Sequence, residues 1–244
     1  MCEKCKTDQF IPTSPSRRSV VLFGASAVGL MVAGTAHARE EKVPPKPQNV
    51  LSPDAALKKL MEGNARYVGG KSQLHDFKHE REALVGGQNP YAAVLSCADS
   101  RIAPEYAFDS ARGDLFVCRV AGNFANNDTV ASMEYAVAVL GTPLILVLGH
   151  DSCGAIDATI KSLKDNMPPP GHIPSLVTAL APAVKASAQQ SGNQLDNAIR
   201  QNVIDNIAKL KSAAPILNAA AEQNKLKVVG GIYRLATGKV ELLS

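Results

Sequence analysis

The sequence predicts an α/β fold in which a largely parallel central β-sheet is flanked by helices. Short apolar runs recur along the chain and are separated by segments with helical spacing, which is the alternation typical of a parallel sheet. The clearest strand is 144–148, where Leu-Ile-Leu-Val-Leu stands between Pro143 and Gly149. A run that is apolar on both faces suits a strand covered by helices on both sides. The composition agrees, because 244 residues with 45% apolar side chains can bury a core without disulfide bonds.

The first helix is predicted from its start signal. Segment 52–54 reads Ser-Pro-Asp, an N-cap followed by a first-turn proline and acid, and this predicts a helix over 53–67. The charged stretch 75–83 is predicted to be a solvated arm, because His75 and His79 have no third ligand spaced to complete a metal site. The period of the remaining chain predicts further strands at 92–96, 115–120, 227–233 and 239–243, and helices at 129–140, from 155, at 174–190 and, as one long helix, at 195–223.

The first 38 residues are typical of an export signal of the twin-arginine type. Arg17 and Arg18 precede an apolar stretch over 20–36, and Ala-His-Ala at 36–38 is a small-x-small cleavage pattern. Three glycines interrupt the apolar stretch, which argues against a stable membrane anchor. We therefore expect this signal peptide to be removed, together with its two cysteines, and the mature chain to be periplasmic in a bacterium.

The rest of the chain is expected to form an extended linker over 39–51, which holds three prolines, and one domain over 52–244. The formal charge is +4 and no dense Lys/Arg run appears, so a nucleic-acid partner is not expected. The five cysteines are irregularly spaced, so they do not predict a disulfide framework.

Potential metal ligands follow two predicted strands. Segment 96–101 reads Ser-Cys-Ala-Asp-Ser-Arg after the first strand, and segment 149–154 reads Gly-His-Asp-Ser-Cys-Gly after the clearest one. In open α/β sheets, ligands bind beyond the carboxyl ends of the strands. Cys97, His150 and Cys153 are therefore expected to converge as three zinc ligands with one open position, which is typical of a catalytic site. Each taken alone suits a buried structural role, and only their joint occurrence favours the site.

These motifs also resemble those of a known family. Cys-x-Asp-x-Arg followed by His-x-x-Cys-Gly is similar to the signature of β-class carbonic anhydrases, as are Gly-Asp-Leu-Phe-Val at 113–117 and Glu-Tyr-Ala-Val at 134–137. The resemblance runs from about residue 52 to 243. It implies one Zn²⁺ per chain and reversible hydration of carbon dioxide to bicarbonate and a proton, by attack of a zinc-bound hydroxide.

The resemblance also assigns roles to individual residues. Asp99 corresponds to a carboxylate that is a fourth zinc ligand in a closed form of the site, or is held off the metal by Arg101 in an open form. Gln88 corresponds to an amide that hydrogen-bonds the substrate, and Gly154 to a position whose backbone lies against it. Phe116 and Tyr135 correspond to an apolar pocket built partly by the neighbouring subunit, which implies a dimer or a tetramer.

Three alternatives stay open. A hydrolase of carbonyl sulfide or carbon disulfide would use the same zinc site. A zinc-holding binding protein would not need an Asp99–Arg101 pair, and a thiol oxidoreductase would need a resolving cysteine, for which Cys118 in its predicted strand offers no support. Val94 replaces the tryptophan with which one branch of the family binds bicarbonate beside an arginine, here Arg119. We therefore expect no bicarbonate-driven closure of that kind.

Overall fold

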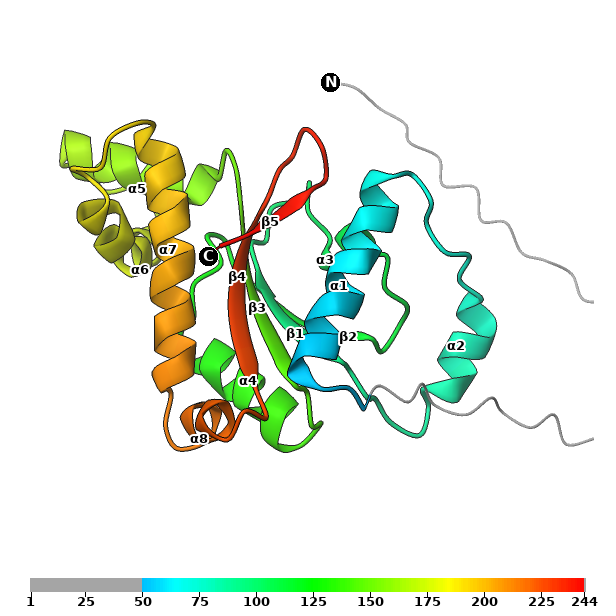
Figure 1. The fold of residues 1–244 in the computed structure, drawn as a ribbon. Helices are drawn as coiled ribbons and strands as arrows, with labels where there is room; N and C mark the ends of the chain where they lie inside the picture. Colours follow the sequence, from blue (N-terminus) through cyan, green and yellow to red (C-terminus); the bar gives the residue numbers. More distant parts are fainter. Residues whose placement is uncertain (1–49, 244) are drawn as a thin grey trace, which may run out of the picture. The chain divides into compact units, whose positions relative to one another are not determined.

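The computed structural model describes residues 50–243, so the predicted signal peptide and nearly all of the predicted linker lie outside the described residues. Its centre is a five-stranded sheet in the order β2-β1-β3-β4-β5 (Figure 1). The first four strands are parallel and the last is antiparallel to its neighbour, as the alternating pattern predicted. The strands are β1 (Ala92–Ser96), β2 (Leu115–Arg119), β3 (Leu144–His150), β4 (Lys227–Tyr233) and β5 (Val240–Leu242).

Helices cover both faces of this sheet. Helices α1 and α3 pack on one face, whereas α4 and α7 pack on the other, with α5, α6 and α8 placed around them (Figure 1). None of the helices within residues 50–243 combines the length and apolar character needed to cross a membrane. The helices are α1 (Pro53–Val68), α2 (Phe77–Ala83), α3 (Pro104–Ala107), α4 (Asn127–Ala138), α5 (Gly154–Asp165), α6 (Pro174–Ala186), α7 (Gln194–Ser212) and α8 (Leu217–Glu222).

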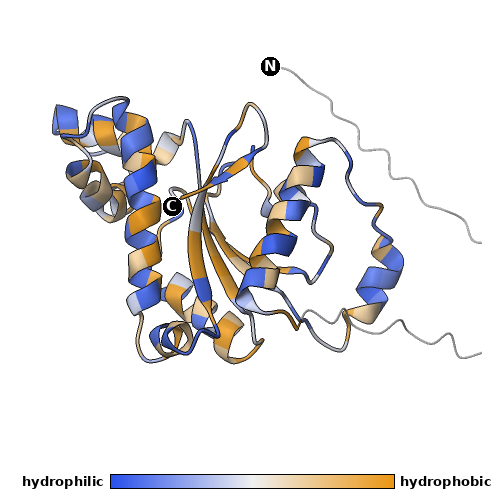
Figure 2. Cartoon of the chain, viewed as in Figure 1, coloured by the Kyte–Doolittle hydropathy of each residue, from blue (hydrophilic) through white to orange (hydrophobic). Residues whose placement is uncertain are grey.

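The central strands are buried on both faces because their side chains alternate between two apolar clusters. In β3, Ile145 and Val147 join the cluster under α4 and α7, whereas Leu144, Leu146 and Leu148 join the cluster under α1. Figure 2 shows the strands as the apolar centre, with hydrophilic residues on the helices around it. Full burial of one such side chain stabilises a fold by about 1.5–3 kcal/mol.

One predicted helix needs correction, and two short helices were not predicted. The helix expected over 195–223 is two helices, because Pro215 lacks an N–H and disfavours helical geometry in the residue before it. The stretch predicted as a solvated arm has no buried residue in α2, as expected, but it forms a short helix that was not predicted. The four-residue helix α3 was not predicted, since it is too short to show a hydrophobic period.

Buried polar groups fix α1 to the strands and loops beside it. Asn64 donates from Nδ2 to the carbonyls of Ala107 (2.9 Å) and Gly238 (2.8 Å), and its Oδ1 accepts from the Val240 amide at 2.9 Å. Burial alone would raise the pKa of Asp109, but hydrogen bonds from Arg66 and the Gln73 amide outweigh it and lower that pKa.

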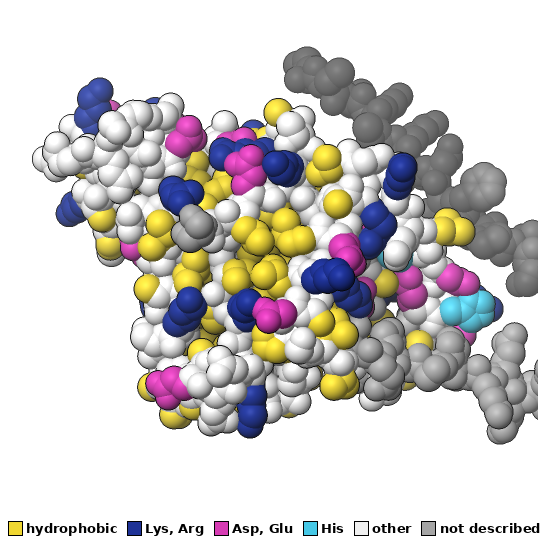
Figure 3. All heavy atoms as spheres, in the orientation of Figure 1, with side chains coloured by type: hydrophobic (Ala, Val, Ile, Leu, Met, Phe, Trp, Pro, Cys, Tyr) yellow, Lys and Arg dark blue, Asp and Glu magenta, His cyan; other side chains and the backbone are white. Residues whose placement is uncertain are grey.

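The sheet has an edge that its last strand only partly covers. Strand β5 pairs with Gly231, Ile232 and Tyr233, so the first half of β4 has no strand partner on that side within the described residues. Figure 3 shows apolar side chains gathered at the middle of the molecular surface in this view, between α7 and α1. Strand edges that lack a strand partner can pair with another protein chain.

Candidate metal centre

The two strand ends named by the sequence lie side by side. Cys97 directly follows β1, and His150 is the last residue of β3, while Ser96 is paired with Leu148 across the two strands. Cys153 then caps the start of α5. The two sulfur atoms and a ring nitrogen of His150 all lie within 4.8 Å of one another. Cys97 is 4% exposed, Cys153 1% and His150 0%.

The orientation of His150 leaves one ring nitrogen for a ligand. Its Nδ1 lies 2.8 Å from the carbonyl oxygen of Asp151, which fixes the ring as a hydrogen-bond donor on that side. Its Nε2 is buried and has no hydrogen-bond partner within the described part of the chain. A buried, unpaired nitrogen beside two thiols fits a zinc ion, which prefers sulfur and imidazole ligands and keeps an open position in catalytic sites.

The ionisation of the three residues is coupled. A hydrogen bond from the Cys153 thiol lowers the pKa of Cys97 to about 4, and the same contact raises the pKa of Cys153. Burial lowers the pKa of His150, but the nearby Cys97 thiolate outweighs this and raises it overall. A buried Cys97 thiolate suits a divalent cation, whose binding would also require Cys153 to lose its proton.

Asp99 and Arg101 form a two-pronged ion pair beside the cluster. Arg101 donates from Nε to Asp99 Oδ1 at 2.9 Å and from Nη2 to Oδ2 at 2.7 Å, and its own amide donates to Oδ1 at 2.9 Å. These bonds hold the pKa of Asp99 well below its usual value. Asp99 Oδ2 is 3.8 Å from His150 Nε2, so the carboxylate lies next to the cluster while Arg101 engages both of its oxygens.

Arg119, the last residue of β2, fixes the backbone of the loop that carries this pair. Its guanidinium donates to the carbonyls of Cys97 (3.0 Å), Asp99 (2.7 Å) and Ile102 (2.8 Å). The sequence indicated Arg119 only through the family resemblance. Every residue has a backbone carbonyl, so the sequence does not show which carbonyls an arginine will bond. Val94 is fully buried within β1.

The other predicted site residues fall into two groups. Gly154 adjoins Cys153, and its Cα faces open space. Gln88 lies in the segment before β1, Phe116 in the first half of β2, and Tyr135 in α4. Phe116 is paired with Ala93 near the start of the strands, and its ring centroid lies 6.4 Å from that of Tyr135. Gln88 precedes β1, so a strand length of roughly 16 Å separates it from the ligands at the other end.

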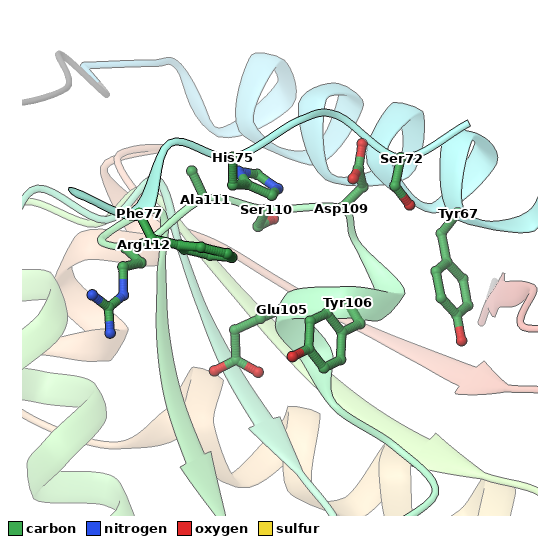
Figure 4. A pocket seen from close by; sticks show the side chains of 10 residues that line it. All are labelled: Tyr67, Ser72, His75, Phe77, Glu105, Tyr106, Asp109, Ser110, Ala111 and Arg112. Atoms are coloured by element: carbon green, nitrogen blue, oxygen red, sulfur yellow. The ribbon is translucent and has the colours of Figure 1, made fainter. Parts of the chain in front are cut away.

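A separate cavity lies on the α1 and α3 side of the chain. It measures about 770 Å³, and Figure 4 shows that it is lined by the end of α1, the segment leading into α2, and α3 with the loop that follows. None of the predicted site residues lines it. His172 is exposed in the loop before α6.

Comparisons with known proteins agree with this site. The sequence profile of a family described as carbonic anhydrase matches residues 92–240. A carbonic anhydrase of Mycolicibacterium smegmatis is 39% identical over 79% of this chain and 94% of its own length. Carbonic anhydrase 2 of Mycobacterium tuberculosis is 38% identical over 78% and 93%. A structure of tetrameric β-carbonic anhydrases from Sordaria macrospora aligns over 78% of this chain and 98% of that chain, with 25% identity and a TM-score of 0.62. The chain belongs to the β-class carbonic anhydrase family.

Proposed function

We propose that this chain hydrates carbon dioxide reversibly to bicarbonate and a proton at the centre formed by Cys97, His150 and Cys153, with Asp99 and Arg101 as its catalytic pair. The observation that carries the proposal is the position of this ion pair, 3.8 Å from a buried imidazole nitrogen that has no hydrogen-bond partner among residues 50–243. A purely structural zinc site needs no such pair, because its ligands already close the coordination shell.

Zinc held by these residues supplies a Lewis acid that lowers the pKa of a bound water to about 7 in the best-known hydrating sites. Asp99 stays ionised at neutral pH because Arg101 lowers its pKa. The carboxylate can therefore accept a hydrogen bond from the O–H of the reacting water. Arg101 fixes the direction of that bond by holding both carboxylate oxygens, and its Nη2 also donates to the Ser152 carbonyl at 3.3 Å. The pair therefore positions the water, whereas the cysteines and the histidine hold the metal.

The alternative that uses the same centre is hydrolysis of carbonyl sulfide or carbon disulfide. Turnover of carbon dioxide and of carbonyl sulfide should be measured on one zinc-loaded preparation. We expect carbon dioxide to be the better substrate by kcat/KM. A preference for carbonyl sulfide would replace the proposed reaction while leaving the metal centre intact.

We further propose that the active unit is a dimer or a tetramer in which one subunit completes the pocket of another. Gln88 and Phe116 lie toward the opposite end of the strands from the cysteines of their own chain, and the ring of Tyr135 lies beside that of Phe116, where a second copy can use them. The described residues also offer surfaces suited to association, namely the half-covered edge at β4 and helix α2, whose Phe77 is 64% exposed.

Mixing two inactive variants tests this shared pocket. Cys153→Ser removes a zinc ligand, and Gln88→Ala removes the predicted substrate donor, so each variant alone should lose activity. If Gln88 acts in the site of its neighbour, a mixed dimer contains one intact site, and random mixing restores about a quarter of the wild-type sites. No recovery from refolded mixtures, in a protein that sediments as a dimer, would contradict the sharing.

We also propose that residues 1–38 direct export by the twin-arginine route. The support is the sequence pattern of Arg17, Arg18 and the apolar stretch that follows. Wild-type chain and an Arg17→Lys, Arg18→Lys double variant should be compared in fractionated bacterial cells. We expect the wild type to be processed and periplasmic, and the variant to remain in the cytoplasm; equal distribution of the two would contradict the proposal.

A further inference from the structure

A second set of buried polar side chains, on α7, bonds the loop that lies beside the metal centre. Asn202 and Asn206 are 2% and 6% exposed, which is unusual for asparagine, and both face the loop that follows β2. Asn202 donates from Nδ2 to the Gly122 carbonyl at 2.9 Å, and Asn206 Oδ1 accepts from the Ala125 amide at 2.7 Å. The two side chains are joined, because Asn206 Nδ2 donates to Asn202 Oδ1 at 3.1 Å.

The loop that they hold touches a zinc ligand directly. The amide of Gly122 donates a hydrogen bond to the sulfur of Cys97 at 3.3 Å, in a buried position. Gly122 has a φ of +87°, and a Cβ there would lie 2.7 Å from Leu180 Cδ1, so both its conformation and its surroundings require glycine. The direction of the Gly122 N–H therefore depends on the backbone conformation of the loop.

Local bonding alone leaves this loop incompletely fixed. Asn123 follows Gly122 with a φ of +41°, and its Nδ2 has no hydrogen-bond partner in the described part of the chain. Within the loop itself, the Asn123 amide donates to the Val120 carbonyl at 2.9 Å. The bonds from α7 are thus the side-chain contacts that fix the carbonyl of Gly122 and the amide of Ala125 in place.

We infer that Asn202, supported by Asn206, is a positioning residue that keeps the Gly122 N–H directed at the Cys97 sulfur and so regulates how much charge this thiolate gives to the metal. The inference rests on the proposed role of Cys97 as a zinc ligand. An N–H donor withdraws electron density from a ligand sulfur, which leaves the metal a stronger Lewis acid. Loss of such outer contacts typically costs about 10–100-fold in metal affinity or activity.

Asn64 provides a matched control. It is also a buried asparagine that bonds three backbone groups, but it does so under the other face of the sheet and touches neither the loop nor the ligands. Asn64→Ala therefore removes comparable buried hydrogen bonds without disturbing the sulfur. A role of Asn202 that is merely structural would make the two variants alike.

The test uses the full chain with its zinc exchanged for cobalt, whose thiolate-to-metal charge-transfer absorption reports the electron density on the sulfurs. Asn202→Ala removes the donor, and Asn202→Asp keeps the side-chain volume and an acceptor for Asn206 while losing the bond to Gly122. We expect this absorption to move to longer wavelength in both Asn202 variants and not in Asn64→Ala, with kcat/KM of the zinc forms lowered about tenfold or more.

The outcomes separate this inference from the proposed function. If the wild type gives no thiolate-to-cobalt absorption, the ligand assignment itself fails. If the wild type gives it and neither Asn202 variant moves it, or Asn64→Ala moves it equally, the positioning role of Asn202 is overturned while the metal centre stands. Asn202→Asp keeps the test decisive if Asn202→Ala does not fold.

Discussion

Replacing Arg101 with methionine should separate catalysis from stability. The side chain of Arg101 is 52% exposed, and exposed ion pairs contribute only about 0.2–1 kcal/mol to folding. The change removes the two guanidinium bonds to Asp99 and the bond to the Ser152 carbonyl, leaving the carboxylate with one backbone donor. The stability of the fold should therefore change little, with a Tm shift of about 2–4 °C at most.

The effect on activity should be much larger. With a single hydrogen bond remaining, the Asp99 carboxylate is free to turn away from the reacting water or toward the metal. Misplacement of a catalytic group by about 1 Å can cost about 100-fold in rate. We therefore expect kcat/KM for carbon dioxide hydration to fall about 100-fold in Arg101→Met, while zinc content stays at the wild-type level because none of the three ligands is changed.

Stopped-flow hydration with a pH indicator, metal analysis and thermal unfolding on the same samples measure the three quantities. Arg200→Met, which removes an exposed arginine of α7, is the matched control and should keep wild-type activity. A loss of activity in Arg101→Met no larger than in Arg200→Met, or one explained by missing zinc or by unfolding, would refute the catalytic role of Arg101.

Three further predictions concern zinc binding, the packing of α1 and the pH dependence of stability. Cys153→Ser should lose zinc and activity together, whereas Cys118→Ser should retain both by metal analysis and hydration assay. Gly63→Ala should destabilise the fold by about 1–3 kcal/mol in urea unfolding, against the usual gain from alanine in a helix, because its Cβ would lie 1.9 Å from the Phe108 carbonyl oxygen. Asp109→Asn should cost about 1.5–3 kcal/mol at neutral pH. Since the native pKa of Asp109 is lowered, that difference should be fully present above the unfolded pKa of about 4 and shrink as pH falls below it; a difference that grows in acid would contradict the assignment.

The metal ligands were predictable from sequence because their positions follow from strand periodicity. Cys97 and His150 stand at the ends of two apolar runs, and parallel strands bring such ends to one edge of the sheet. The first helix was predictable for a similar reason, since Ser52 carries its cap signal next to it in the chain. In both cases the decisive information lies within a few residues of the element.

The contacts that hold the centre in place were not predictable in this way. Asn202 bonds a carbonyl 80 residues away, and Arg119 bonds carbonyls 17 to 22 residues away, and neither acceptor depends on side-chain identity. The apolar spacing continues across the break between α7 and α8, so the hydrophobic period predicts one helix there although Pro215 interrupts it. Long-range hydrogen bonding to backbone therefore accounts for most of what the sequence left unpredicted.

The central claim is that this chain uses one zinc ion, held by Cys97, His150 and Cys153, to hydrate carbon dioxide. The most direct test is metal analysis of the purified full chain, paired with a stopped-flow hydration assay before and after zinc removal and reloading. We predict one zinc per chain, hydration that disappears with the metal, and recovery on adding zinc back. One zinc per chain without hydration, or hydration that survives complete zinc removal, would contradict the account.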